Sequence, residues 1–353
     1  MKWPIVTRRR ALAASGSILA GSRLVDAQKL VGEPPGRIAP PAELVNAYEF
    51  EAMAERKLGG AANAEMVASD RKAMDRITFN PRMMVNTTKL NLSTDLFGDN
   101  LNWPILIGPA AEQRRFHPEG ELAMARGAAA AKTGMVVSDH SSFPIDQITA
   151  QAKTPFWYQV YLEKDSTAVH GRIDRAVKAG CKAVVITIGV PNAPIGGPAQ
   201  PPTLVDWSAI DQMRKGITVP VLLKGVIGPE EAQMAVSRGM QGIVVSNHER
   251  RLVPQAASGI QTLALVAQAV GGKVPILVDG GFCRGSDVIK ALALGAQGVL
   301  MCRAALWALA AYGAEGVQHM LGLVQNELAR DMMMCGLVNV KAITAAAVTV
   351  HRR

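Results

Sequence analysis

The chain has 353 residues, a formal net charge of +9 and an aromatic content of 5%. Its length is sufficient for one large α/β domain, and no Ser/Gly-rich or charged linker after about residue 40 separates two smaller ones. Because lysine and arginine are scattered and aromatic residues are few, the composition argues against nucleic acid as a partner. A basic balance suits anionic substrates and a phosphate-bearing cofactor, although an ordinary solvated surface has the same signature.

The amino-terminal segment has the order of a signal peptide. Arg8, Arg9 and Arg10 precede an apolar stretch at 11–20 that is too short to cross a bilayer as a helix. The adjacent arginines predict a twin-arginine signal over residues 1–27, with a small-residue cleavage site at 25–27. We therefore expect a periplasmic or otherwise exported protein, with a basic tail as the alternative.

Short apolar runs recur along the rest of the chain and predict eight strands. They span residues 103–109, 134–140, 156–162, 183–189, 219–225, 242–248, 275–281 and 298–303. Because the runs are continuous rather than alternating, we expect strands that are covered on both faces, as in a parallel sheet with helices outside.

Ala-rich amphipathic stretches separate most of these strands, for example 118–127 and 228–236. Eight alternating units favour a closed (β/α)₈ TIM barrel over residues 101–353, preceded by a short helical extension at 28–100. An open doubly wound sheet would more often carry a GxGxxG motif after its first strand, and the sequence has none there.

Polar residues close the predicted strands, at the carboxyl face where barrels of this kind gather their chemistry. Lys224 and His248 each end an otherwise apolar run, a costly place for an ionisable group unless it faces a cavity or a partner. Two glycines, Gly280 and Gly281, follow the seventh strand, and Arg303 closes the eighth. We therefore expect a phosphorylated ligand between strands seven and eight.

The four cysteines have no CxxC spacing and no histidine at metal-ligand spacing, so the sequence predicts no metal site. We expect most of them to be buried free thiols. Cys283 and Cys302 fall at the ends of neighbouring predicted strands, so a disulfide between them is an alternative in an oxidising compartment.

Three motifs carry a family resemblance: Leu223-Lys224-Gly225, Val245-Ser246-Asn247-His248 with Arg251, and Val278-Asp279-Gly280-Gly281 with Arg284-Gly285-Ser286-Asp287. They resemble the motifs of the FMN-dependent α-hydroxy-acid oxidases and dehydrogenases, such as glycolate oxidase and the flavin lactate and mandelate dehydrogenases. The resemblance extends over nearly the whole chain after the predicted signal. It implies a (β/α)₈ barrel that binds FMN and oxidises a small 2-hydroxy acid to the 2-oxo acid.

The resemblance also implies roles for individual residues. FMN would lie against Pro109, Ala110, Ala111, Ser138, Gln159, Thr187, Lys224 and Ser246, with its phosphate at Asp279, Gly281, Cys302 and Arg303 and with Gly280 beside it. His248 would remove a proton from the substrate, Lys224 would stabilise negative charge on the reduced flavin, and Tyr161 would hydrogen-bond the substrate. Arg251 would hold the substrate carboxylate, and His140 would line the pocket.

Several positions depart from the family pattern. Gly189 replaces the aspartate that orients the active histidine, and without that carboxylate proton transfer to His248 should be slower. Near the active histidine, Glu249 and Arg250 replace two glycines, and Ile195 and Gly196 lie near the place of a missing second arginine. The segment Leu58-Gly59-Gly60-Ala61 lacks the tyrosine of the family, and His140 stands where a large aromatic residue is frequent. Cys283 replaces an arginine, and Cys302 replaces a glycine.

These departures keep two alternatives open: an FMN-binding barrel that has lost or changed the reaction, and a barrel that binds another phosphate ligand without flavin chemistry. The sequence does not name the substrate or the electron acceptor, which could be oxygen, a quinone or a cytochrome. The resemblance suggests a homotetramer.

Overall fold

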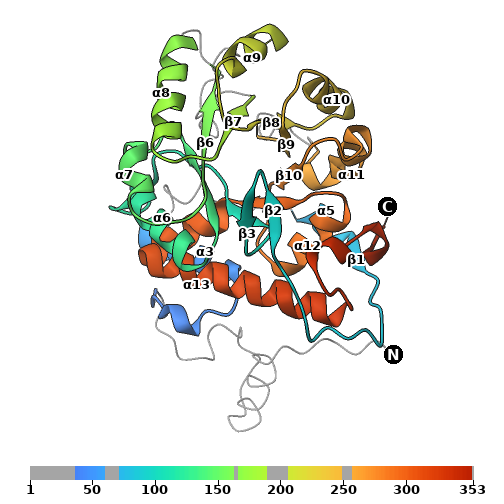
Figure 1. Cartoon of the computed structure of the whole chain (residues 1–353). Helices are drawn as coiled ribbons and strands as arrows, with labels where there is room; N and C mark the ends of the chain where they lie inside the picture. Colours follow the sequence, from blue (N-terminus) through green and yellow to red (C-terminus); the bar gives the residue numbers. More distant parts are fainter. Residues whose placement is uncertain (1–35, 60–70, 163–165, 189–205, 249–256, 352–353) are drawn as a thin grey trace. The chain divides into compact units, whose positions relative to one another are not determined.

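The computed structural model describes residues 36–59, 71–162, 166–188, 206–248 and 257–351. Eight parallel strands form a closed barrel in the order β10-β11-β4-β5-β6-β7-β8-β9, which confirms the predicted (β/α)₈ fold (Figure 1). The strands are β4 (Ile105–Ile107), β5 (Gly134–Ser138), β6 (Phe156–Tyr161), β7 (Ala183–Thr187), β8 (Val221–Val226), β9 (Gly242–Val245), β10 (Ile276–Asp279) and β11 (Gly298–Met301).

All eight barrel strands are shorter than the apolar runs that predicted them. The run at 242–248, for example, contracts to β9, so that Ser246 and His248 follow the strand instead of ending it. Several polar residues therefore lie at or beyond the end of the hydrogen-bonded ladder, at the mouth of the barrel, whereas Gln159 and Lys224 lie within β6 and β8. β8 is also shorter than its predicted run, but it ends one residue later than predicted, through an irregularity between Lys224 and Val226.

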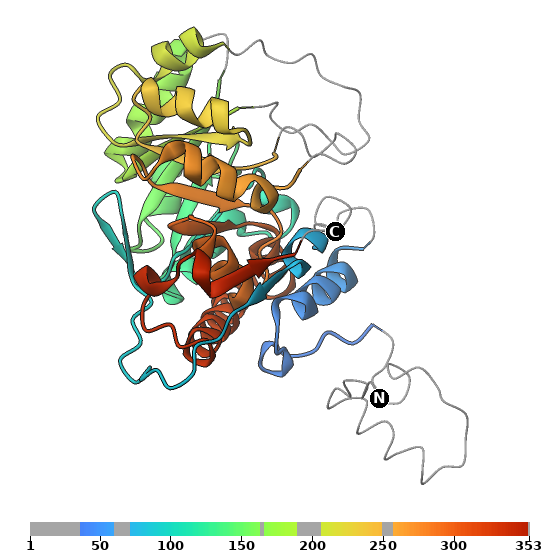
Figure 2. The same ribbon diagram turned by 90° about the vertical axis from the view of Figure 1, so that its right-hand side faces the viewer.

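Helices alternate with the strands around the barrel (Figures 1 and 2). They are α6 (Gly120–Ala130), α7 (Ile145–Thr149), α8 (Ser166–Lys178), α9 (Trp207–Arg214), α10 (Pro229–Ser237), α11 (Gly259–Val270), α12 (Gly285–Ala293) and α13 (Arg303–Met334). Local signals set their starts: α10 has proline in its first turn followed by two glutamates, and α11 begins with a capping box from Ser258 and Gln261.

A hairpin of β2 (Thr94–Leu96) and β3 (Asp99–Leu101) closes the amino-terminal end of the barrel. Leu96 and Leu101 are buried in one cluster with side chains of the barrel strands, and Phe97 packs edge-to-face on Trp157 at 5.4 Å between ring centroids. Phe97 also lies against Gly242, the first residue of β9. Because apolar side chains fill this end, the carboxyl ends of the strands are left as the place for a ligand.

The segment that precedes the barrel contains helices, as predicted, together with short strands that the sequence pattern did not indicate. The helices are η1 (Pro41–Glu43), α3 (Ala47–Leu58) and α5 (Lys72–Asp75), and α3 packs against α13. β1 (Ile77–Phe79) pairs antiparallel with β12 (Val348–Val350), near the end of the chain. A three-residue strand is too short to show a period of two. No helix within the described ranges combines the length and the hydropathy that crossing a bilayer requires.

Candidate active site

Inside the barrel, an apolar layer is followed by a polar layer toward the carboxyl ends. The apolar layer includes Val136, Trp157, Val185, Leu222, Val244, Leu277 and Leu300, which belong to one buried cluster. Two residues farther along the same strands stand Ser138, Gln159, Thr187, Lys224, Ser246, Asp279 and Cys302. Since residues two apart on a strand share a face, these polar side chains form the next layer. The layer contains seven of the residues that the sequence assigned to FMN.

Lys224 supplies the buried cation of this layer. Its Nζ lies 3.0 Å from Asp279 Oδ2 and donates a hydrogen bond to Ser246 Oγ at 3.3 Å, so three neighbouring strands meet at this one group. The side chain of Lys224 is 4% exposed. Gly225 directly after it has φ +104°, in the left-handed region that favours glycine, at the irregularity in β8.

Tyr161 and His248 contact each other at the same mouth. The Tyr161 hydroxyl and His248 Nε2 are 3.0 Å apart, and the two rings lie 6.0 Å between centroids. The backbone N–H of His248 donates to Ser246 Oγ at 3.2 Å, which fixes the chain just after β9. Through Ser246 the structure brings together Tyr161, His248 and Lys224, the three residues predicted from the sequence as catalytic.

His140 follows β5 and has a carboxylate partner that the sequence analysis missed. His140 Nδ1 is 2.7 Å from Asp139 Oδ1, and Arg172 Nη2 on α8 is 3.4 Å from the other oxygen of Asp139. The rings of His140 and Tyr161 pack edge-to-face, with 5.5 Å between their centroids and 70° between their planes. His140 therefore stands beside the predicted catalytic pair.

Two polar atoms of the layer have no hydrogen-bond partner within the described part of the chain. They are Gln159 Nε2 and Thr187 Oγ1, and both side chains are almost completely buried. A buried donor or acceptor without a partner costs about 1–3 kcal/mol, so such atoms indicate a ligand that satisfies them. The flavin ring system carries both N–H and carbonyl groups. The donor set at these positions fits FMN on this ground.

The corner between β10 and β11 has the features of a phosphate site. Gly280 and Gly281 have φ of +103° and +81°, and a Cβ built on Gly280 would meet no atom within 4 Å. The next strand leads into α13, which begins at Arg303 without a side-chain cap from Cys302. Open glycine backbone and an uncapped helix N-terminus both suit an anion.

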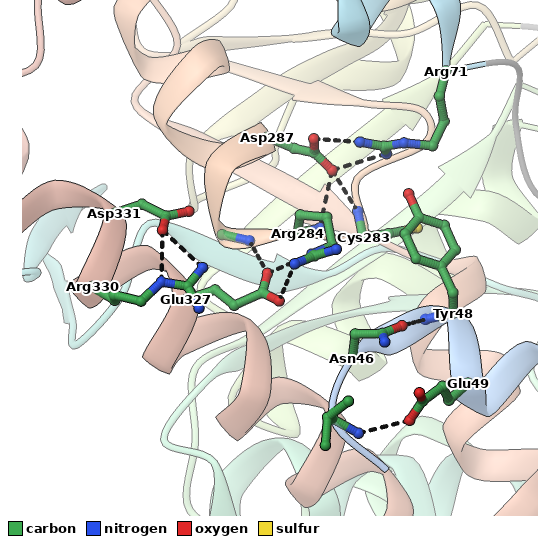
Figure 3. A network of polar contacts seen from close by, with 12 residues as sticks. Asn46, Tyr48, Glu49, Arg71, Cys283, Arg284, Asp287, Glu327, Arg330 and Asp331 are labelled. Atoms are coloured by element: carbon green, nitrogen blue, oxygen red, sulfur yellow. Dashed lines mark hydrogen bonds and ion pairs between the residues drawn. The ribbon is translucent and has the colours of Figure 1, made fainter. Parts of the chain in front are cut away.

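The N-terminus of α12, by contrast, is already occupied by two carboxylates of the protein (Figure 3). Asp287 Oδ2 accepts hydrogen bonds from the backbone N–H groups of Cys283 and Arg284, both at 3.0 Å. Glu327 Oε2 accepts the N–H of Gly285 at 3.0 Å. These amides are therefore not available to a phosphate, which leaves the glycine pair and the start of α13.

Arg71 connects this network to the glycine turn. Its guanidinium contacts both oxygens of Asp287, at 2.5 and 2.9 Å, and donates to the carbonyl oxygen of Gly281 at 2.7 Å. Asp287 is fully buried. No sequence signal pointed to Arg71, since it lies 216 residues from Asp287 along the chain.

All four cysteines are free thiols, so the alternative of a disulfide between Cys283 and Cys302 is not realised. Cys302 Sγ instead contacts the carbonyl oxygen of Pro109 at 3.7 Å, at the start of the half-buried segment that continues through Ala110 and Ala111. Burial, assisted by the charge of Asp287, raises the pKa of Cys283 to about 12. Within the described ranges, no three His, Cys, Asp or Glu side chains gather as a metal site would require.

Several sequence-based assignments fall outside the described residues. These are the substrate arginine Arg251, the departures Gly189, Ile195, Gly196, Glu249 and Arg250, the residues Gly60 and Ala61, and the predicted signal at 1–27.

Comparison with known proteins identifies the family. Residues 51–195 and 198–350 match the sequence model of the FMN-dependent dehydrogenases. A peroxisomal (S)-2-hydroxyacid oxidase of Arabidopsis thaliana is 34% identical over 346 residues, which cover 86% of this chain and 95% of that protein. Glycolate oxidase of Spinacia oleracea is 32% identical over 349 residues, with the coverage again 86% and 95%.

Solved structures agree with these relatives. Mandelate oxidase with (S)-2-phenylpropionate has a TM-score of 0.80 at 34% identity, covering 87% of this chain and 98% of that chain. An Arg-to-Lys mutant of flavocytochrome b2 has a TM-score of 0.83 at 27% identity, covering 89% and 88%.

The relatives correct the expectation about location. The prediction of a twin-arginine signal and a periplasmic or exported protein is wrong, because a matched relative is peroxisomal. The prediction rested on three arginines before a short apolar stretch, a pattern that a basic tail shares. The segments that match the family model begin only at residue 51, so the amino-terminal arginines lie outside the match.

The barrel, the polar layer and the match over nearly all of residues 51–350 together identify the family. The chain belongs to the FMN-dependent dehydrogenase family.

Proposed function

We propose that this protein oxidises a small 2-hydroxy acid to the corresponding 2-oxo acid, with FMN as its cofactor. The observation that carries the proposal is the 3.0 Å contact between Tyr161 and His248, at the same barrel mouth as the buried pair of Lys224 and Asp279. A phenol and an imidazole suit the binding of a hydroxyl group and the removal of its proton. The curated relatives support the proposal because they are hydroxy-acid oxidases.

FMN, when bound, supplies the two-electron acceptor that this oxidation needs. The residues that would hold its ring system are Pro109, Ala110, Ala111, Ser138, Gln159, Thr187, Lys224 and Ser246, and those that would hold its phosphate are Gly280, Gly281, Cys302 and Arg303. We assign Asp279 to the ribityl hydroxyl groups, because a carboxylate accepts hydrogen bonds from hydroxyls but repels a phosphate. Lys224 contributes a fixed positive charge, which stabilises negative charge that develops during reduction.

His248 is the base in this proposal, and it takes the proton from the substrate at Nε2. Two contacts orient it: the Tyr161 hydroxyl meets Nε2, and Ser246 Oγ accepts the backbone N–H. Neither contact carries the negative charge of the family carboxylate that Gly189 replaces, so we still expect proton transfer to be slower than with that carboxylate. Tyr161 would share its hydroxyl with the substrate, and Arg251 would bind the carboxylate through two parallel N–H donors.

The test is an anaerobic half-reaction. The purified, flavin-loaded protein is mixed without oxygen with glycolate, lactate or mandelate, and the visible absorbance of oxidised flavin is followed. We expect it to bleach with at least one acid and to bleach far more slowly in His248→Gln. Retained absorbance with every acid in a broader panel would instead establish the alternative of a barrel that has lost the reaction, which the relatives do not favour.

We further infer that oxygen is the electron acceptor and that the protein is a homotetramer. The relatives named as oxidases support the first inference, and hydrogen peroxide formed in stoichiometric amounts with the 2-oxo acid tests it. Exposed apolar side chains support the second: Met83, Met84 and Met334 are 81%, 101% and 74% exposed. Light scattering on the eluted peak tests the assembly, and a monomer would overturn it.

A further inference from the structure

Glu121 is a buried acidic residue that has no part in the oxidation proposed above. It lies in the first turn of α6, and it is 0% exposed. A carboxyl group that is taken out of water costs free energy unless hydrogen bonds compensate for the lost hydration. The groups that bond to Glu121 therefore define what it does.

One oxygen of Glu121 joins two loops that follow neighbouring strands. Oε1 accepts the backbone N–H of Gln113, which opens η3 (Gln113–Arg115) after β4, and the backbone N–H of Ser142 after β5, both at 3.0 Å. β4 and β5 pair directly in the barrel. Hydrogen bonds from N–H groups to a carboxylate are among the stronger ones in proteins. Glu121 thus fixes the two loops relative to each other.

Backbone contacts hold the same two loops together on either side of Gln113. The N–H of Glu112 donates to the carbonyl oxygen of His140 at 3.0 Å, and the N–H of Arg114 donates to Ser142 Oγ at 3.1 Å. Glu112 has φ +48°, in the left-handed region that residues other than glycine seldom adopt. Such a conformation persists only where the surrounding structure holds it, so this turn depends on its contacts.

Gln113 connects these contacts to the segment that we place against the flavin. Its side-chain Nε2 donates to the carbonyl oxygen of Ala110 at 3.3 Å, and Gln113 is itself only 1% exposed. Ala110 and Ala111 are half-buried, and in the proposed function they lie beside the flavin ring. A displacement of η3 would therefore move the backbone beside the ring.

Gly120 allows the start of α6 to approach η3 this closely. Its φ is +40°, and a Cβ placed there would lie 2.9 Å from the backbone nitrogen of Arg114. A side chain at position 120 would therefore collide with the backbone of η3 and push it away from Glu121.

We propose that Glu121 is a positioning residue of the flavin site, which holds the loop after β4 against the flavin ring by joining it to the loop after β5. The inference rests on where the proposed function places FMN. Both N–H donors meet Oε1, whereas Oε2 has no hydrogen-bond partner within the described part of the chain. An amide oxygen also has two lone pairs for two donors, so the role requires an acceptor and not a charge.

The experiment titrates FMN into the apoprotein of each variant and measures the dissociation constant and the visible circular dichroism of the bound flavin. Glu121→Met leaves two N–H groups without their acceptor. We expect the dissociation constant to rise by about 10-fold or more and the dichroism of the bound flavin to change. Glu121→Gln should match the wild type in both measurements, because it retains the acceptor oxygen.

Glu119→Met is the matched control. Glu119 stands at the start of the same helix, but its side chain is 54% exposed and pairs with Arg126, so this variant should leave both measurements unchanged. Gly120→Ala keeps the carboxyl group of Glu121 and displaces η3 instead. It should raise the dissociation constant of FMN in the same direction, and it gives an independent measurement where Glu121→Met does not fold.

Two results would overturn the inference. One is a lower melting temperature of Glu121→Met with the dissociation constant and the dichroism of the wild type, since Glu121 would then stabilise the fold alone. The other is a loss in Glu121→Gln as large as that in Glu121→Met, since the charge would then be what matters. Failure of every 2-hydroxy acid to reduce the flavin overturns the proposed function instead, and the titrations, which need only FMN, still decide the role of Glu121.

Discussion

Lys224 and Asp279 form an ion pair across the barrel mouth, with Nζ and Oδ2 at 3.0 Å and side chains that are 4% and 18% exposed. They come from β8 and β10, and Ser246 at the end of β9 accepts a hydrogen bond from Nζ between them. Two charges removed from water are stable only while each compensates the other. The pair therefore ties the cation of the site to the strand that leads into the glycine turn.

Replacing Lys224 with methionine leaves the Asp279 carboxylate without its countercharge. We expect flavin reduction to slow by about 100-fold or more and the free energy of unfolding to fall by about 3–5 kcal/mol. The control is the double variant Lys224→Met with Asp279→Asn, which should recover most of the stability but not the rate. Stopped-flow reduction and urea unfolding give the two numbers, and a rate close to that of the wild type would exclude an electrostatic role for Lys224.

Replacing Tyr161 with phenylalanine removes the hydroxyl that meets His248 Nε2 and keeps the ring that packs on His140. The rate constant for flavin reduction should fall by about 10-fold or more, since one hydrogen bond that orients the base is lost. The melting temperature should stay within a few degrees of the wild type. A reduction rate that is unchanged at saturating substrate would show that Tyr161 acts only in packing.

The contact between Arg71 and Asp287 should control how tightly FMN is retained. Arg71→Met removes the guanidinium from Asp287 and from the Gly281 carbonyl, so the glycine turn loses the side chain that holds it to α12. We expect the dissociation constant of FMN to rise by at least about 10-fold, measured by fluorescence of the released flavin. Arg330→Met is the matched control, because Arg330 pairs with its neighbour Asp331 and, within the described residues, is not bonded to the glycine turn (Figure 3). Equal FMN retention in both variants would contradict the role of Arg71.

The polar layer could be predicted from the sequence because its signal is local. Each member ends an apolar run two residues after a core position, as Lys224 does after Leu222, and the strand period then fixes its face. The contact between Arg71 and Asp287 could not be predicted, since 216 residues separate them and only the folded chain joins them. Asp139 was missed for a different reason: it precedes His140 directly, and alternation predicts that neighbours on a strand point apart. The turn after β5 overrides that expectation.

The buried cysteines should resist alkylation in the folded protein. Burial raises the pKa of Cys181 and of Cys283 to about 12, so at pH 8 only about one thiol in ten thousand is the reactive thiolate. Mass spectrometry after iodoacetamide treatment should find these two sites unmodified in buffer and modified in urea. Labelling of Cys283 at the rate of a free thiol would contradict its burial in the folded protein.

The same thiols make stability depend on pH in a defined direction. The ordinary pKa is 9.0 and the folded value is about 12, so the folded state favours the protonated thiol. This contribution is complete below pH 9 and is lost as the pH rises from 9 toward 12. The urea midpoint should therefore fall between pH 8 and pH 10, and the fall should be smaller in Cys181→Ala. An identical slope in that variant would assign the effect to other groups.

The direction in which the Lys224 side chain extends from β8 depends on the backbone conformation of Gly225. Its φ is +104°, and a Cβ placed there would lie 2.9 Å from the carbonyl oxygen of Ile188. Gly225→Ala should therefore lower the free energy of unfolding by about 1–3 kcal/mol and, because the strained residue follows Lys224 directly, should also slow flavin reduction. Gly171 is the matched control: it is exposed on α8 with open space around its Cβ position, so Gly171→Ala should stabilise the helix by roughly 0.5–1 kcal/mol and leave the rate unchanged. If Gly225→Ala lowers stability without changing the rate, the irregularity in β8 serves the barrel alone, and the position of Lys224 must be fixed by Asp279 and Ser246.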